Sequence, residues 1–147
     1  MKIFIGADHA GYEMKNELKK YLEEFGYEVK DMGDSTYDEK DDYPDFIRPV
    51  AEMVAKDPEN SRGIIIGGSG QGEAMVANRL RGVRAAVLYD YNENIVGLSR
   101  EHNNANVLSL GARFIDLDEA KNAVKIWLET PFSEDERHVR RIKKIDE

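Results

Sequence analysis

The sequence predicts an α/β fold in one domain, with a doubly wound parallel sheet of five strands between two layers of helices. Short, nearly all-apolar stretches alternate with helical patterns along the whole chain, and strands buried on both faces of a parallel sheet have this composition. A length of 147 residues is typical of one domain, and no linker, repeat or low-complexity tract divides it. We therefore expect a single domain over 1–147 with the common strand order 2-1-3-4-5, a Rossmann-like arrangement.

The expected strands are short apolar stretches, and they lie at 2–7, 27–32, 64–66, 83–89 and 106–110. The first helix is indicated by apolar residues at helical spacing from Met14 to Phe25, and Gly26 ends it as a C-cap. The second helix begins at Pro44, which suits a first helical turn, and continues to about Lys56. The acidic, turn-rich segment 33–43 before it is predicted to be a solvated loop.

Four helices are expected in the rest of the chain. One follows the glycine-rich segment 67–72, with Ala74, Ala77 and Leu80 on its apolar face, and two more lie at 92–102 and 117–129. A charged terminal helix is expected over 134–144. Because this extended helix has few apolar residues, we expect it to pack on a neighbouring subunit.

Composition excludes several classes of protein. The chain has 21 Lys+Arg against 29 Asp+Glu and a net charge of −8, which argues against nucleic acid or an anionic membrane as a partner. Cysteine is absent, so disulfides, thiolate metal sites and cysteine nucleophiles are excluded. No membrane span or signal peptide is visible in the sequence, and we expect a cytoplasmic protein.

Two distinctive segments follow the first and third expected strands, namely Asp8-His9 and Gly67 to Gly72. In doubly wound sheets, ligands bind at the carboxyl ends of the strands, where the strand order reverses. With the expected order this point lies between the first and third strands. We therefore expect both segments to line one binding site.

The glycine-rich segment favours an anion. Glycines at 67, 68, 70 and 72 let the backbone approach a ligand closely, and the N–H groups that open the next helix would stabilise a phosphate or an oxyanion. The segment matches neither a P-loop nor a dinucleotide fingerprint. The alternative is a tight strand-to-helix turn that binds nothing.

Glu73 and Ser69 are candidates for chemistry beside this loop. Glu73 stands in the first turn of the following helix, where it either only complements the helix dipole or acts as a general base. We expect the dipole to favour its ionised form. Ser69 either caps the helix or donates a hydrogen bond to a bound oxygen.

His9 and His102 are candidates for proton transfer, because imidazole both donates and accepts protons near neutral pH. The alternative is that each is a structural hydrogen-bonding group. No close metal-ligand spacing occurs in the sequence, so we expect no metal. Arg137 and Arg141 are spaced to share one helical face, where they could grip a phosphate. Alternatively, they belong to a solvated basic tail.

Six segments in order carry a resemblance to a known family: Asp8-His9-Ala10-Gly11, Asp42-Tyr43-Pro44, Gly67-Gly68-Ser69-Gly70-Gln71-Gly72, Arg84-Ala85-Ala86, Ser99 to Asn106, and Arg137-His138. With these segments the chain resembles ribose-5-phosphate isomerase B over nearly its whole length, a family that includes galactose-6-phosphate isomerase subunits. The resemblance implies a metal-free and cofactor-free aldose–ketose isomerase that works through a cis-enediolate. It also implies a homodimer or homotetramer with sites shared between subunits.

The resemblance also implies roles for individual residues. Asp8 and His9 would line the sugar phosphate, His102 would donate a proton in ring opening, and Asn103 would contact the substrate. Arg113, Arg137 and Arg141 would hold the phosphate. The loop of Gly67, Gly68, Ser69, Gly70, Gln71 and Gly72 would stabilise the enediolate oxygen.

One departure from the family concerns the base. Many members have cysteine at the position of Gly67, whereas this chain resembles a branch with glutamate as the base, at the position of Glu73. Both positions flank one loop, so either side chain could reach the same C2 proton. We expect isomerisation of ribose 5-phosphate and ribulose 5-phosphate. The alternatives are isomerisation of another pentose or hexose phosphate, or a non-catalytic module that binds a sugar phosphate or a nucleotide.

Overall fold

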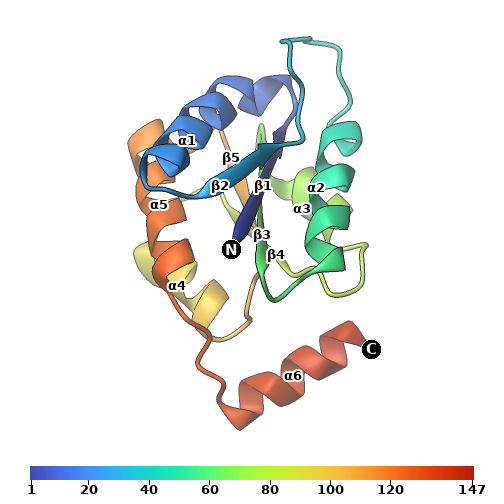
Figure 1. Ribbon diagram of the computed structural model, residues 1–147, viewed down its shortest axis with the longest axis vertical. Helices are drawn as coiled ribbons and strands as arrows, with labels where there is room; N and C mark the ends of the chain where they lie inside the picture. Colours follow the sequence, from blue (N-terminus) through green and yellow to red (C-terminus); the bar gives the residue numbers. More distant parts are fainter.

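Five parallel strands form one sheet in the computed structural model, which describes residues 1–147 (Figure 1). The strands are β1 (Lys2–Ala7), β2 (Glu28–Asp31), β3 (Ser61–Gly67), β4 (Ala85–Leu88) and β5 (Val107–Gly111). The helices are α1 (Tyr12–Glu24), α2 (Pro44–Lys56), α3 (Gln71–Ala77), α4 (Glu93–Glu101), α5 (Leu117–Glu129) and α6 (Glu136–Asp146), with a 3₁₀ turn at His9–Gly11. The predicted fold class and all five strands are confirmed.

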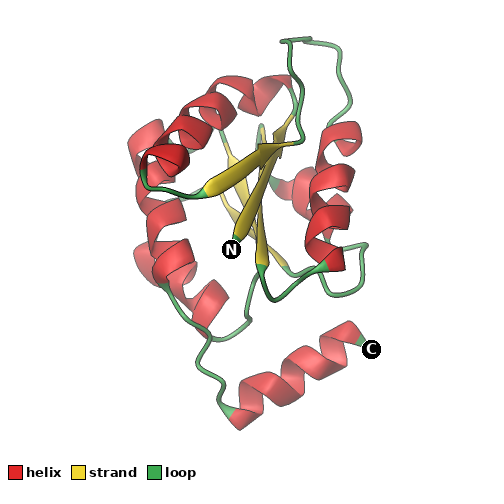
Figure 2. Cartoon of the chain, in the orientation of Figure 1, coloured by secondary structure: helices red, strands yellow, loops and turns green.

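Helices cover both faces of the sheet, as predicted, with α1, α4 and α5 on one side and α2 and α3 on the other (Figure 2). Side chains alternate along a strand, so Ile64 and Ile66 pack in the first core while Ile65 packs in the second. Trp127 of α5 is fully buried in the first core, and Val50 and Val54 of α2 are fully buried in the second. No helix is both long and apolar enough to cross a membrane.

The order of the last two strands differs from the prediction. The sheet has the order β2-β1-β3-β5-β4 rather than 2-1-3-4-5. All five residues of β5 are buried, as a central strand requires, whereas three of the four residues of β4 are only partly buried. The neighbouring positions of β1 and β3 are unaffected, so the reversal in strand order lies where it was expected.

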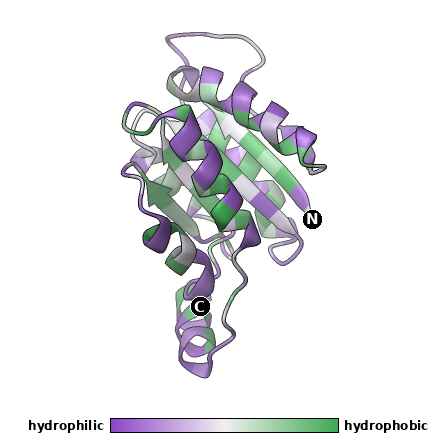
Figure 3. Ribbon diagram, turned by 90° about the vertical axis from the view of Figure 1, so that its left-hand side faces the viewer, coloured by the Kyte–Doolittle hydropathy of each residue, from purple (hydrophilic) through white to green (hydrophobic).

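The terminal helix begins two residues later than predicted. Glu134 has a φ of 58°, in the left-handed region, so the helix cannot include it, and α6 starts at Glu136 instead. The helix projects from the body of the molecule (Figure 3), and His138 is its only buried residue.

Candidate active site

Asp8 and the glycine-rich loop leave the sheet side by side, as predicted. Ala7 at the end of β1 pairs with Ile66 near the end of β3, so the segments that follow these strands start at the same edge. The Asp8 carboxylate accepts hydrogen bonds from the N–H groups of Ala10 (3.0 Å) and Gly11 (3.4 Å) and caps the short 3₁₀ turn. These two hydrogen bonds fix the Asp8 side chain at the bottom of the site.

The glycine-rich loop is held in one shape by its surroundings. Gly70 has a φ of 77°, which a side chain would strain. Its carbonyl accepts a buried hydrogen bond of 2.5 Å from the Ser109 hydroxyl on β5. Ser69 remains within the loop, where its hydroxyl accepts a long hydrogen bond of 3.4 Å from the N–H of Gln71. The Ser69 hydroxyl proton is therefore available for a ligand oxygen.

Glu73 is buried beside Gly67. Only 4% of Glu73 is exposed, and a Cβ built on Gly67 would overlap its carboxylate. Burial raises the pKa of the Glu73 carboxyl, and the charge of Asp8 raises it further, while the backbone amides of Glu73 and Gly70 oppose both effects. The prediction that the helix dipole favours the ionised form of Glu73 is wrong, because the loss of hydration raises the pKa more than the backbone donors lower it.

The acidic segment before α2 forms one wall of the site. Asp41 Oδ1 lies 2.5 Å from His9 Nδ1, and 6% of the Asp41 side chain is exposed. A Cβ built on Gly72 would lie 2.8 Å from the ring and hydroxyl of Tyr43, so Tyr43 packs against the start of α3. The prediction of a solvated loop is wrong for Asp41, whose burial depends on a contact 32 residues away in the chain.

Arg113 supplies a cation at the same edge. It follows β5, and its N–H donates to the Gly68 carbonyl (3.1 Å). A Cβ built on Gly68 would lie 3.2 Å from the guanidinium, so only glycine leaves this side chain its full space. The charge of Arg113 also acts on His9. The chain therefore brings together Asp8, His9, the loop 67–72, Glu73 and Arg113.

His102 and Asn103 lie at the opposite end of the sheet. Helix α4 runs back from the end of β4 to the start of β5, so its last turn is at the amino ends of the strands. The His102 ring stacks on His138 of α6, with centroids 4.3 Å apart and planes 13° apart. Burial lowers the pKa of His138, and the neighbouring His102 lowers it further.

Arg137 and Arg141 also lie on α6, away from the glycine-rich loop, and both are exposed. Figure 1 shows α6 beyond the amino ends of the strands, with the acidic loop at the other end of the molecule. The chain therefore divides the predicted site residues into two groups. We call them the loop group (Asp8, His9, 67–73, Arg113) and the helix group (His102, Asn103, Arg137, Arg141).

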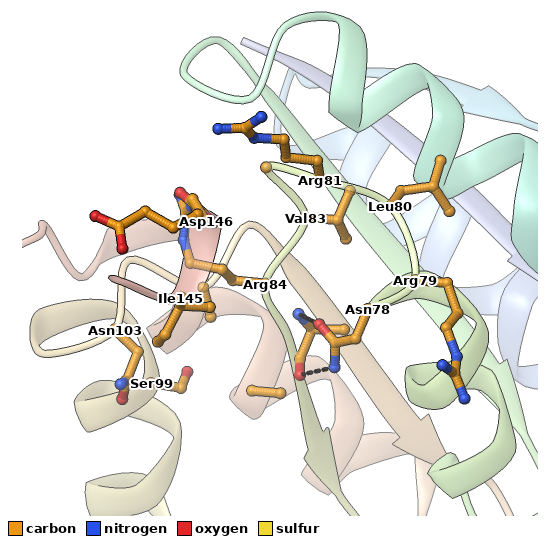
Figure 4. Close-up of a pocket in the computed structure, with 15 residues that line it drawn as sticks. Asn78, Arg79, Leu80, Arg81, Val83, Arg84, Ser99, Asn103, Ile145 and Asp146 are labelled. Carbon is orange, nitrogen blue, oxygen red and sulfur yellow. Dashed lines mark hydrogen bonds and ion pairs between the residues drawn. The ribbon is translucent and has the colours of Figure 1, made fainter. Parts of the chain in front are cut away.

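One pocket lies at the end of the sheet that holds the helix group. It has a volume of about 550 Å³ and is bounded by the segment from Asn78 to Ala86, by Asn103 and by the end of α6 (Figure 4). Arg84 in its wall forms a 2.8 Å ion pair with Asp146 of α6. No residue of the loop group lines this pocket.

Asp8, His9 and Asp41 are the residues that could offer ligands to a metal ion, since their donor atoms lie within 4.8 Å of one another. The His9 Nδ1 is already engaged by Asp41, so this geometry is that of a proton-sharing pair. Asp41 was missed at the sequence level. The acidic run 38–42 was visible, but nothing in it distinguished the one carboxylate that reaches His9.

Comparison with known proteins identifies the family. A family model described as Ribose/Galactose Isomerase matches residues 3–145. Ribose-5-phosphate isomerase B of Mycobacterium tuberculosis (strain H37Rv) is 42% identical over 142 residues, which are 97% of this chain and 86% of that protein.

Solved structures agree with this result. Ribose-5-phosphate isomerase B from Mycoplasma genitalium with bound ribulose-5-phosphate has a TM-score of 0.94 and 40% identity, over 99% of this chain and 93% of that one. The enzyme of the same name from Clostridium thermocellum has a TM-score of 0.92 and 45% identity, over 99% and 95%. Because the family model and these relatives match nearly the whole chain, the protein belongs to the ribose/galactose isomerase family of enzymes.

Proposed function

We propose that the protein interconverts ribose 5-phosphate and ribulose 5-phosphate through a cis-enediolate, with Glu73 as the base. The observation that carries the proposal is the Glu73 carboxylate, 4% exposed and set against Gly67 within the glycine-rich loop. A relative 40% identical holds ribulose-5-phosphate. A carboxyl whose pKa is raised by burial is a better proton acceptor near neutral pH than an ordinary one.

In this mechanism Glu73 removes the C2 proton of the open-chain aldose and returns it to C1, while the hydroxyl proton moves from O2 to O1, which gives the ketose. The negative charge that develops on the enediolate oxygen is stabilised by the Ser69 hydroxyl and by N–H groups of the loop 67–72. Arg113 and His9 take the phosphate on the same chain. No metal or cofactor takes part, and Asp8 orients the sugar.

The helix group completes the site from a second subunit. His102 donates a proton in ring opening, Asn103 contacts the sugar, and Arg137 and Arg141 hold the phosphate. Since one chain holds the two groups at opposite ends of its sheet, a symmetric homodimer or homotetramer is the arrangement that would join them. The exposed arginines of the projecting helix α6 support this proposal.

A second candidate substrate is a hexose phosphate, because the family description names both ribose and galactose. The test is an isomerase assay of the purified chain with ribose 5-phosphate, galactose 6-phosphate and other phosphorylated aldoses, with and without EDTA. We expect the highest kcat/KM with ribose 5-phosphate, unchanged by EDTA. A higher value with a hexose phosphate would overturn the substrate, and activity lost to EDTA and restored by a metal would overturn the mechanism.

A further inference from the structure

His9 of the loop group forms a short hydrogen bond with Asp41 of the acidic segment 33–43. The His9 Nδ1–H donates to Asp41 Oδ1 at 2.5 Å. The Asp41 side chain is almost fully buried, with 6% exposed, whereas 25% of the His9 side chain is exposed. One edge of the imidazole therefore faces a buried carboxylate, and the other edge is free for a ligand.

We propose that Asp41 is a positioning residue, which keeps His9 doubly protonated and turns its Nε2–H toward the phosphate of the substrate. The inference rests on the proposed function for the identity of that ligand. It assigns to the acidic loop a part in binding, through one carboxylate that never touches the sugar phosphate itself.

The charges around His9 support a protonated ring. Asp41 lies in hydrogen-bond contact, and Asp8 Oδ2 lies 3.9 Å from the same nitrogen. Arg113 is the opposing cation, and Tyr37 contributes a neutral ring edge, with centroids 6.3 Å apart. The hydrogen bond to Asp41 is the largest influence on the pKa of His9, which is raised despite some desolvation and the charge of Arg113.

Asp41 has no other donor to satisfy it. Its second oxygen, Oδ2, is buried and has no hydrogen-bond partner. A buried carboxylate without compensation is costly, so the His9 cation is the group that offsets its charge. The pairing therefore offsets a buried negative charge as well as fixing the imidazole ring.

The acidic loop is anchored so that it delivers this carboxylate. At its start, the buried Lys15 Nζ donates to Asp31 Oδ2 (2.5 Å) and to the Asp34 carbonyl (3.0 Å). At its end, Tyr43 packs on Gly72. Between these points the Asp41 N–H donates to the Asp38 carbonyl (3.2 Å). The position of Asp41 is thus set before any ligand arrives.

A phosphate needs this cation because the loop group is rich in carboxylates. Asp8 and Glu73 act on each other electrostatically, and Asp41 adds a third negative charge. Arg113 alone would face these three acids and an incoming dianion. A protonated His9 doubles the positive charge that the loop group offers to a phosphate, and it adds a charge-assisted hydrogen bond.

The test compares Asp41→Asn with Asp42→Asn. Asparagine at position 41 keeps an acceptor for Nδ1–H but loses the charge. Asp42 is an exposed acid of the same loop, so Asp42→Asn controls for the change in net charge. We expect the His9 titration, followed by NMR of the imidazole nitrogens, to move to lower pH in Asp41→Asn only. At pH 8, KM for ribulose 5-phosphate and Kd for inorganic phosphate should rise about tenfold, because one charge-assisted hydrogen bond is lost. kcat should stay within about twofold.

A double-mutant cycle separates positioning from a merely structural role. His9→Gln should raise KM at all pH values, and adding Asp41→Asn to it should raise KM no further. Asp41→Glu should keep the higher His9 titration, because it keeps the charge. An unchanged His9 titration in Asp41→Asn, or an equal loss of binding in the His9→Gln background, would overturn the inference. If the wild type isomerises none of the sugars tested, the proposed function fails, whereas the His9 titration and the phosphate Kd still decide the role of Asp41.

Discussion

The carboxylate of Glu73 occupies the space that a side chain at Gly67 would fill. A Cβ built on Gly67 overlaps both carboxylate oxygens and the carbon between them more closely than real atoms approach. The two positions are six residues apart, on the two sides of the glycine-rich loop. A base at this point can therefore be presented from the end of β3 or from the first turn of α3, but not from both.

Replacing Gly67 by alanine should lower kcat by about 100-fold, because a shift of about 1 Å in a catalytic group costs this much. The methyl group would push the Glu73 carboxylate away from its place, while the phosphate-binding groups remain. Steady-state kinetics with ribose 5-phosphate measures the effect. Gly97→Ala is the matched control, since a Cβ there meets nothing within 4 Å. Equal kcat values for the two variants would contradict this account of the site.

Moving the base across the loop should restore part of the reaction. In Glu73→Ala the space beside position 67 is empty, and adding Gly67→Cys places a thiol there. We expect kcat of the double variant to exceed that of Glu73→Ala, mainly above about pH 8, where an ordinary thiol ionises. The native chain has no cysteine, so inactivation by iodoacetamide would report this residue alone. A double variant no more active than Glu73→Ala would refute the idea that a base at position 67 can replace Glu73.

Glu73→Gln should stabilise the protein at neutral pH. Burial raises the pKa of Glu73 in the folded chain, so the folded state binds more protons than the unfolded state between the ordinary and the raised pKa. Wild-type stability therefore falls as the pH rises through this window, and the neutral amide avoids that loss. We expect Tm to rise by about 2–4 °C at pH 7, with little difference at pH 3, measured by calorimetry. A lower Tm of Glu73→Gln at pH 7 would contradict the predicted gain in stability.

Mixing two inactive variants should restore activity if the site is shared. Glu73→Gln lacks the loop-group base, and His102→Asn lacks the helix-group proton donor. In a symmetric dimer that contains one of each, one of the two sites has both native residues. Random exchange of subunits should then give about one quarter of wild-type kcat. Equal amounts of Glu73→Gln and Glu73→Ala are the control and should stay inactive. No recovery after exchange, verified by native mass spectrometry, would place both residues in one chain's site.

The sequence was sufficient for the fold class and for the edge that carries the loop group. Ile64 to Ile66 and the stretches like it are apolar on both faces, which determines a parallel sheet between helices. Gly26 located the end of the first helix, and Pro44 located the start of the second. Asp8 follows β1 and the glycine-rich loop follows the adjacent strand β3, so their meeting was predictable from topology alone.

Three features depend on contacts that no local pattern encodes. The order of β4 and β5 depends on which of the two strands pairs with β3, and in the folded sheet it is β5. The contact between Asp41 and His9 depends on the path of an eleven-residue segment, 33–43, that is anchored by the buried Lys15. The raised pKa of Glu73 likewise depends on how much water the fold removes around it.

The most direct test of Glu73 as the base is incubation with ribose 5-phosphate in heavy water, with deuterium at C2 followed by NMR. We predict that the wild type incorporates deuterium at C2, whereas Glu73→Gln binds ribose 5-phosphate with a Kd within several-fold of wild type and incorporates almost none. Exchange by Glu73→Gln at the wild-type rate would contradict the account, since another group would then be removing the proton.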